Sequence, residues 1–127
     1  MLKPHLLAGL LAIAPIAAFA HGTPPAAAHG GQVVEASAEH WVELVNKAGQ
    51  LTIYVLDADK NPVPSAQLTG KATVLVGGKS QQAMLTPAEG NSLTGKLDPA
   101  ASGKVTAVLS LTVAGKSAQA RFASVQQ

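Results

Sequence analysis

Hydrophobic and polar residues alternate most clearly near the C-terminal end of the chain. Between residues 105 and 113 every second residue is Val, Ala or Leu, and serine and threonine occur among the residues between them. This period of two is that of a β-strand with one buried face. After a turn at residues 114–116 a last strand follows, and we expect its Ala118, Ala120 and Phe122 to face inward.

Six further short runs of strand-forming residues precede this hairpin, and each ends in turn residues such as glycine, asparagine or aspartate. Short strands that recur about every 8–12 residues are typical of an antiparallel β-sandwich. We therefore predict an all-β fold, a small immunoglobulin-like antiparallel β-sandwich. The alternative is a helix over residues 36–47, because Ser37 resembles a helix cap and alanine and glutamate favour helix. The expected strands are residues 33–36, 40–46, 51–57, 67–76, 80–86 and 92–97.

The first twenty residues differ in character from the rest. Lys3 is followed by an apolar run from Leu6, and Ala18-Phe19-Ala20 is the small-x-small pattern that signal peptidase requires. The run is shorter than the roughly 20 apolar residues needed to span a bilayer, and no second run of spanning length follows. We predict a cleaved signal peptide over residues 1–20 and a periplasmic or secreted mature protein with no membrane span.

The segment after the predicted cleavage site is small, rich in alanine and proline, and without periodicity. We expect a flexible N-terminal tether at residues 21–30. The remaining residues, 31–127, are expected to form a single β-sandwich domain, because their number suits one hydrophobic core.

The chain contains no cysteine, which excludes thiolate catalysis, thiolate metal sites, disulfides and a lipid-modified cysteine at the cleavage site. Without Lys3, eight lysines and arginines oppose seven aspartates and glutamates, and the basic residues are scattered singly. This balance is not that of a protein that binds nucleic acid or an anionic membrane surface.

No sequence pattern points to an enzyme or to an organic cofactor. The chain has no G-x-S-x-G motif and no glycine-rich loop before a helix, so neither acyl transfer nor nucleotide chemistry is expected. Asp57-Ala58-Asp59-Lys60-Asn61 has oxygens at the spacing that begins a calcium loop, but the glycine and the terminal glutamate of that motif are missing. We interpret it as a strand-ending turn.

Three histidines remain after cleavage, and each is a candidate metal ligand. His21 would be the first residue, so its free amine and its imidazole could chelate one ion in a single ring. Cu(II) suits this arrangement because it heads the divalent affinity order and accepts nitrogen ligands in a plane. A third nitrogen from His29 or His40 would complete the site. The alternative is a disordered terminus that binds nothing.

His29 precedes Gly30-Gly31, where missing side chains allow unusual backbone angles and the close approach of another group. Its imidazole could ligate copper or zinc. Glu35 and Glu43 are the carboxylates best placed on neighbouring strands to join a histidine in a metal site. The alternative is that the glycines only turn the chain into the first strand. His29 would then be solvated, and both carboxylates would lie at solvated strand edges.

His40 begins a strand and, by alternation, shares a face with Val42 and Leu44. At the rim of the core it could ligate a metal or bond a backbone carbonyl. Glu43 falls on the opposite face if the strand is regular. Trp41 is interpreted as a core or sheet-face anchor, with ligand stacking as the alternative.

Four short motifs follow one another along the chain: His29-Gly30-Gly31, Trp41-Val42-Glu43-Leu44-Val45, Leu51-Thr52-Ile53-Tyr54 and Asp59-Lys60-Asn61-Pro62-Val63. Their order resembles that in the N-terminal periplasmic domain of adaptor (membrane-fusion) subunits of heavy-metal efflux pumps of the resistance-nodulation-division class. The resemblance covers roughly residues 29–97.

This resemblance implies metal handling near the first histidine of the motif, and it carries over only His29 and Glu43. The adaptors continue into a helical hairpin and a barrel, so the resemblance implies a free-standing exported relative. Two functions are therefore expected. The first is to bind or buffer copper or zinc through His21, His29, His40 and Glu43, with a periplasmic efflux component as partner. The second is that of a metal-free interaction module that docks through a sheet edge.

Overall fold

The computed structural model describes residues 23–37, 39–76, 78–97 and 105–125 of the 127 residues. All of its regular structure is strand, apart from one 3₁₀ turn at Ser65–Gln67. Each of the eight runs expected from the alternation is a strand. The helix considered over residues 36–47 is wrong, because that segment contains the whole of strand β2. The strands are β1 (Gln32–Ala36), β2 (His40–Lys47), β3 (Gln50–Leu56), β4 (Leu68–Val76), β5 (Lys79–Pro87), β6 (Ser92–Lys96), β7 (Val105–Val113) and β8 (Lys116–Val125).

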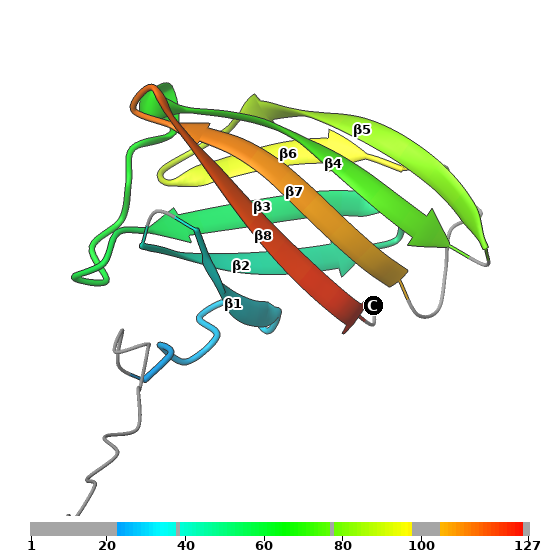
Figure 1. The fold of residues 1–127 in the computed structure, drawn as a ribbon, viewed down its shortest axis with the longest axis horizontal. Helices are drawn as coiled ribbons and strands as arrows, with labels where there is room; N and C mark the ends of the chain where they lie inside the picture. Colours follow the sequence, from blue (N-terminus) through cyan, green and yellow to red (C-terminus); the bar gives the residue numbers. More distant parts are fainter. Residues whose placement is uncertain (1–22, 38, 77, 98–104, 126–127) are drawn as a thin grey trace, which may run out of the picture.

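The strands pair in the order β1-β2-β3-β6-β5-β4-β7-β8, and every neighbouring pair is antiparallel. Strands β1-β2-β3-β6 form one layer and β5-β4-β7-β8 form the other, and two packed antiparallel layers of short strands are the architecture of an immunoglobulin-like sandwich. In Figure 1, β7 and β8 cross in front of β2 and β3. The predicted all-β, immunoglobulin-like sandwich is confirmed, with β1 added beside β2.

The two layers are joined along one side by β5. This strand pairs with β4 from Gly70 to Val76 but with β6 only at Thr86 and Pro87. On the opposite side β1 and β8 approach each other. There the Ser37 N–H donates to the Gln119 carbonyl over 2.9 Å, and the Gln119 N–H donates to Ser37 Oγ over 2.7 Å. The sheet is therefore nearly closed on itself.

The hydrophobic core lies between the layers and is built from the inward-facing residues of each strand. Phe122 is the largest fully buried side chain, and most of its neighbours in the core are Ala, Val and Leu. Ala118, Ala120 and Phe122 all face inward, as the alternation on the last strand predicts. Burial of these small side chains supplies the main favourable contribution to folding.

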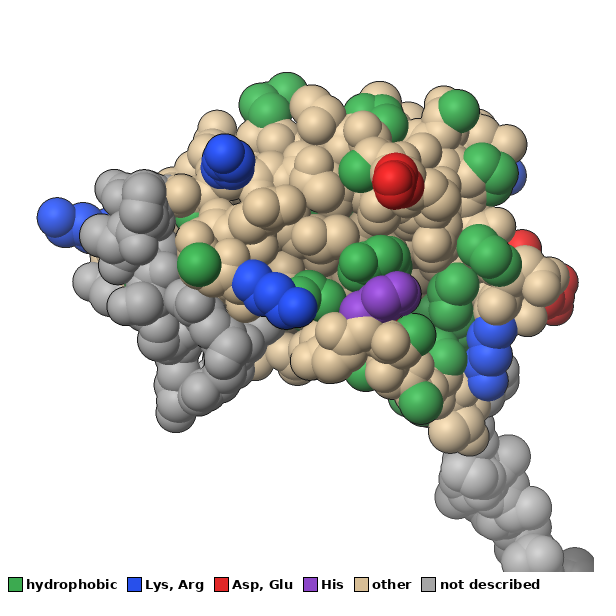
Figure 2. Space-filling model, turned by 180° about the vertical axis from the view of Figure 1, so that it is seen from behind, with side chains coloured by type: hydrophobic (Ala, Val, Ile, Leu, Met, Phe, Trp, Pro, Cys, Tyr) green, Lys and Arg blue, Asp and Glu red, His purple; other side chains and the backbone are tan. Residues whose placement is uncertain are grey.

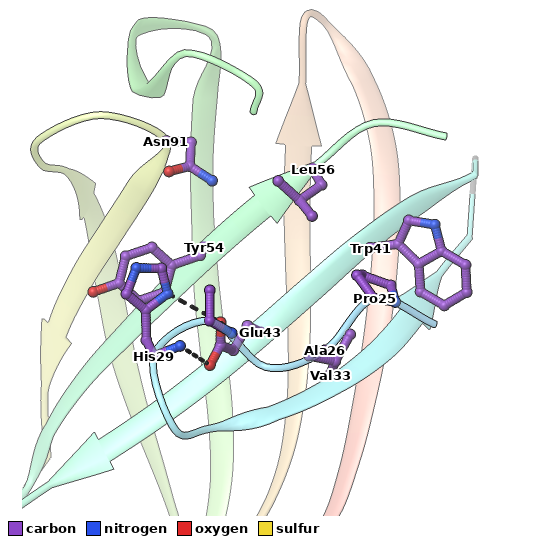
Figure 3. A pocket seen from close by; sticks show the side chains of 10 residues that line it. Pro25, Ala26, His29, Val33, Trp41, Glu43, Tyr54, Leu56 and Asn91 are labelled. Atoms are coloured by element: carbon purple, nitrogen blue, oxygen red, sulfur yellow. Dashed lines mark hydrogen bonds and ion pairs between the residues drawn. The ribbon is translucent and has the colours of Figure 1, made fainter. Parts of the chain in front are cut away.

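The outer face of β2 is also covered, which is unusual for one layer of a sandwich. Trp41 and Glu43 alternate with the core residues Val42 and Leu44, yet all four are buried. The cover includes residues 25–29, which belong to the segment expected as a tether and lie beside β2 and β3 (Figure 3). Glu43 is consequently a buried carboxylate outside the main core.

The predicted signal peptide, residues 1–20, and His21 lie outside the described residues. Within the part of the chain that the structure describes, no helix is long and apolar enough to cross a membrane.

Candidate functional site

Glu43 lies at the centre of three neighbouring strands. It is the register partner of Val33 on β1 and of Tyr54 on β3. The β2–β3 pairing follows from the two-residue turn at Ala48 and Gly49, whose φ angles of 51° and 87° suit the tight turn of a hairpin. Because paired side chains share a face, Glu43 and Tyr54 project together from the outer side of the layer.

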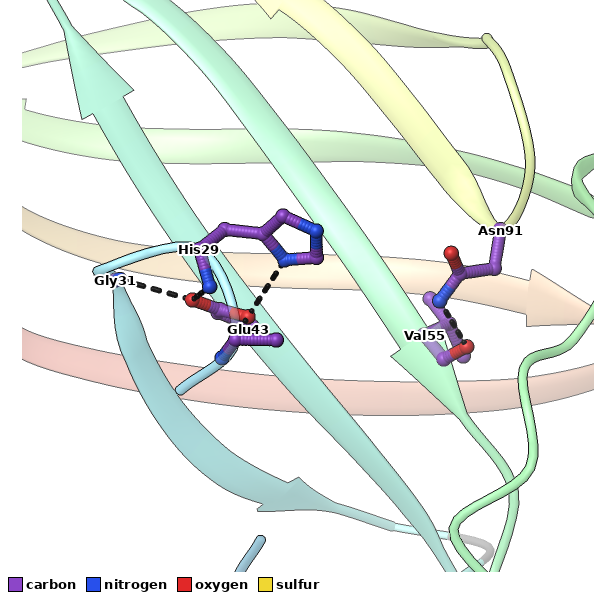
Figure 4. A network of polar contacts seen from close by, with 6 residues as sticks. His29, Gly31, Glu43, Val55 and Asn91 are labelled. Carbon is purple, nitrogen blue, oxygen red and sulfur yellow. Dashed lines mark hydrogen bonds and ion pairs between the residues drawn. The ribbon is translucent and has the colours of Figure 1, made fainter. Parts of the chain in front are cut away.

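The carboxylate of Glu43 accepts hydrogen bonds from the segment that precedes β1. Its Oε1 accepts from the Ala28 N–H over 3.2 Å, and its Oε2 accepts from the N–H groups of His29 and Gly31 over 2.9 and 2.8 Å. Figure 4 shows how these donors converge on one side chain. Neighbouring backbone N–H groups that point into one concavity form a natural anion site. Glu43 fills that concavity from within the protein.

Gly30 and Gly31 make this convergence possible for two different reasons. Gly30 has a φ of +77°, in the left-handed region that favours glycine, and open space surrounds the position of a missing Cβ. At Gly31 space is the constraint, because a Cβ would collide with the carbonyl oxygen of Leu44 and lie 2.8 Å from Val45 Cγ2. The His-Gly-Gly motif therefore folds the chain tightly onto β2.

Burial alone raises the pKa of the Glu43 carboxyl. The hydrogen bonds from the Gly31 N–H, the His29 ring and the His29 N–H together outweigh that effect, so the pKa of Glu43 lies below its usual value. Glu43 is therefore ionised at neutral pH and can act only as a hydrogen-bond acceptor.

This charge determines which ring nitrogen of His29 faces Glu43 with a proton. Its Nδ1 lies 3.0 Å from Glu43 Oε1, and the carboxylate has no proton to give, so Nδ1 must carry one. In the neutral imidazole the other nitrogen, Nε2, then holds a free lone pair. The arrangement is the one found around metal-binding histidines, in which a carboxylate orients the ring through its second nitrogen.

The ring of His29 is also held by stacking. It lies on the ring of Tyr54 with centroids 3.6 Å apart and planes within 5°. The side chain of His29 keeps 43% of its surface exposed, whereas that of Glu43 keeps 7%. The imidazole is thus available to a ligand while its carboxylate partner is not. Figure 2, which views the molecule from behind, shows a histidine side chain at the surface with hydrophobic side chains next to it.

A small pocket opens beside His29 (Figure 3). The space is about 50 Å³, far below the several hundred Å³ of a site for an organic ligand. It suits an ion with a few water molecules. Its walls are mostly apolar, with His29, Glu43, Tyr54 and Asn91 as polar members; the other lining residues are Pro25, Ala26, Ala28, Val33, Trp41 and Leu56.

Of the four residues expected to hold a metal, the structure brings His29 and Glu43 together and places His40 elsewhere. His40 shares the core-facing side of β2 with Val42 and Leu44, as the alternation predicts, and its Nδ1 is buried without a hydrogen-bond partner among the described residues. His21 is outside the described residues. Within the described ranges, no three histidine or acidic side chains are grouped so that they could hold a metal ion.

Tyr54 and Asn91 also line the pocket, and neither was expected at the site. Tyr54 could have been found, because a two-residue turn at residues 48 and 49 pairs residue 43 with residue 54. Asn91 offered no such signal, because it belongs to the turn between β5 and β6 and reaches the site only through the fold. The Asp57 loop is a strand-ending turn, as interpreted: Asp57 Oδ1 accepts from the N–H groups of Asp59 and Asn61, each over 2.9 Å.

Comparison of this chain with protein-family models, with curated proteins and with solved structures gives no match.

Proposed function

We propose that this protein is exported and binds a transition-metal cation, copper or zinc, with His29 as the central ligand. The observation that carries the proposal is the 3.0 Å contact between His29 Nδ1 and the buried, ionised carboxylate of Glu43. That contact turns the free Nε2 of an exposed imidazole into a metal ligand of defined orientation. Glu43 serves as the positioning residue, since its oxygens are already occupied by protein donors.

The remaining ligands come from water and from the N-terminus. If cleavage follows residue 20, the amine and imidazole of His21 lie eight residues before His29 and add a chelate to the same ion. An open coordination shell suits a protein that buffers a metal or passes it to an efflux component, because ligands that exchange readily allow release. His40 contributes no ligand to this site, since it faces the other side of β2.

The rival function is that of a metal-free module that docks through a sheet edge. It has less support, because the two edge strands, β1 and β8, are hydrogen-bonded to each other where Ser37 meets Gln119. A partner strand would have to displace these contacts. A titration with metal separates the two functions directly.

The test uses the mature chain, stripped of metal with a chelator and titrated calorimetrically with Zn(II) and Cu(II). We expect one ion per chain, a loss of at least about tenfold in affinity for His29→Ala, and a loss of about 10–100-fold for Glu43→Gln. His40→Ala is the matched control and keeps the wild-type affinity. Wild-type affinity in His29→Ala, or no binding by the wild type, overturns the proposal.

A further inference from the structure

Asn91 lines the same pocket as His29, and two hydrogen bonds to the backbone of Val55 hold it in place. Its Nδ2 donates to the Val55 carbonyl over 2.9 Å, and the Val55 N–H donates to the Asn91 carbonyl over 3.0 Å. A backbone carbonyl only accepts, so the amide atom that meets it must be the nitrogen. Asn91 Oδ1 is then the atom left to act as an acceptor.

The free acceptors of His29 and Asn91 lie toward one another. In Figure 4 the ring nitrogen of His29 that does not bond Glu43 is on the side of Asn91, and the side-chain oxygen of Asn91 is on the side of His29. Both residues line the pocket of about 50 Å³. His29 Nδ1 is bonded to Glu43, and Asn91 Nδ2 is bonded to the Val55 carbonyl. These bonds orient both acceptors before any ligand binds.

The two acceptors, His29 Nε2 and Asn91 Oδ1, lie beside the ionised carboxylate of Glu43, and together they favour a small, positively charged ligand. The remaining walls are mostly apolar, and none of the residues that line the pocket carries sulfur. A nitrogen donor combined with an oxygen donor suits a borderline divalent cation that keeps water in its coordination shell. The space admits such a hydrated ion and is too small for an organic ligand.

We propose that Asn91 Oδ1 is the second protein donor of the His29 site, binding the divalent cation directly or through one of its water molecules. This inference rests on the proposed metal binding at His29. It adds a ligand from the turn between β5 and β6, so that the bound ion connects the N-terminal segment to a distant part of the sandwich.

The test follows the isotopically labelled mature protein by NMR during titration with Zn(II), which is diamagnetic. We expect the ¹⁵N signal of His29 Nε2 and the ¹³Cγ signal of Asn91 to shift along one common binding curve. Asn91→Ala lowers the Zn(II) affinity roughly tenfold, as loss of an outer ligand typically does, while the His29 Nε2 shift on saturation remains. Asn61→Ala, an exposed asparagine in a turn, is the matched control and leaves the affinity unchanged.

The outcomes separate this inference from the proposed function. If Zn(II) leaves the His29 Nε2 signal unmoved, metal binding at His29 itself fails. If His29 shifts while Asn91 ¹³Cγ does not, His29 remains a ligand and the role of Asn91 is wrong. The wild-type ¹³Cγ signal decides this even where Asn91→Ala unfolds the protein.

Discussion

Glu43 and Tyr54 are direct partners across β2 and β3, and the imidazole of His29 engages both of them. It bonds the carboxylate of the first over 3.0 Å and stacks on the ring of the second with centroids 3.6 Å apart. One residue of the N-terminal segment thus makes a charged contact and an aromatic contact with neighbouring strands. Through these two contacts, the proline- and alanine-rich segment before β1 packs against the outer face of β2 and β3.

Replacing Glu43 should release that segment. Glu43→Ala removes the acceptor of three backbone N–H groups, and we expect the free energy of unfolding to fall by about 1–3 kcal/mol. Chemical denaturation measures the change. The emission of Trp41, the only tryptophan in the chain, should move to longer wavelength as its cover loosens. Glu89→Ala, at an exposed turn position, is the control, and equal losses in both variants contradict the assigned role.

The same carboxylate should make stability depend on pH. The pKa of Glu43 is lowered in the folded protein, so the unfolded chain takes up its proton first as the solution is acidified. The contribution of Glu43 is therefore complete at neutral pH and is lost as the pH falls through the ordinary carboxyl pKa of 4.5 and below it. The difference in unfolding free energy between wild type and Glu43→Gln should shrink over that interval. A difference that stays constant with pH is the contrary result.

Most of the fold was predictable because its signals are local. Alternation placed every strand within a residue or two, and it also put His40 and Glu43 on opposite faces of β2. The pairing of β2 with β3 follows from a two-residue turn. The motif His29-Gly30-Gly31 indicated a close approach, and the structure shows that the approaching group is β2 itself.

The long-range contacts were not predictable from the same patterns. Asn91 and Val55 are 36 residues apart, and Ser37 and Gln119 are 82 residues apart. Neither the alternation of hydrophobic residues nor a turn motif predicts these two contacts. The composition of residues 21–30 predicts a tether, and it gives no sign of the hydrogen bonds that the N–H groups of Ala28 and His29 donate to Glu43.

The two glycines of the motif should respond differently to substitution. Gly31→Ala forces a Cβ against the Leu44 carbonyl and the Val45 side chain, and we expect a loss of about 1–3 kcal/mol, as for overpacking. At Gly30 a Cβ would meet open space, so the strain of the positive φ is the only cost. We expect Gly30→Ala to lower the free energy of unfolding by about 1–2 kcal/mol. Gly78→Ala, with a φ of +84° and open space, is the reference for Gly30. Denaturation curves that rank Gly31→Ala as the mildest of the three contradict the steric argument.

Asn46 is a buried amide on the core-facing side of β2. Neither its Nδ2 nor its Oδ1 has a hydrogen-bond partner among the described residues, and an unpaired buried amide costs about 1–3 kcal/mol. Asn46→Val keeps a strand-forming side chain and removes both polar atoms. We therefore expect the midpoint of thermal unfolding to rise. A fall in the midpoint shows instead that the amide is satisfied, for example by an ordered water molecule.

The contact between β1 and β8 should control how firmly the sandwich is closed. Ser37 Oγ accepts the Gln119 N–H over 2.7 Å, and Ser37→Ala removes that acceptor while leaving the bond from the Ser37 N–H to the Gln119 carbonyl. We expect faster hydrogen exchange at the Gln119 amide and little change at the amides that pair β2 with β3, because opening at an edge is local. Ser117→Ala, at an exposed position on β8, is the matched control. An unchanged exchange rate at Gln119 in Ser37→Ala means that the second bond alone keeps the edges together.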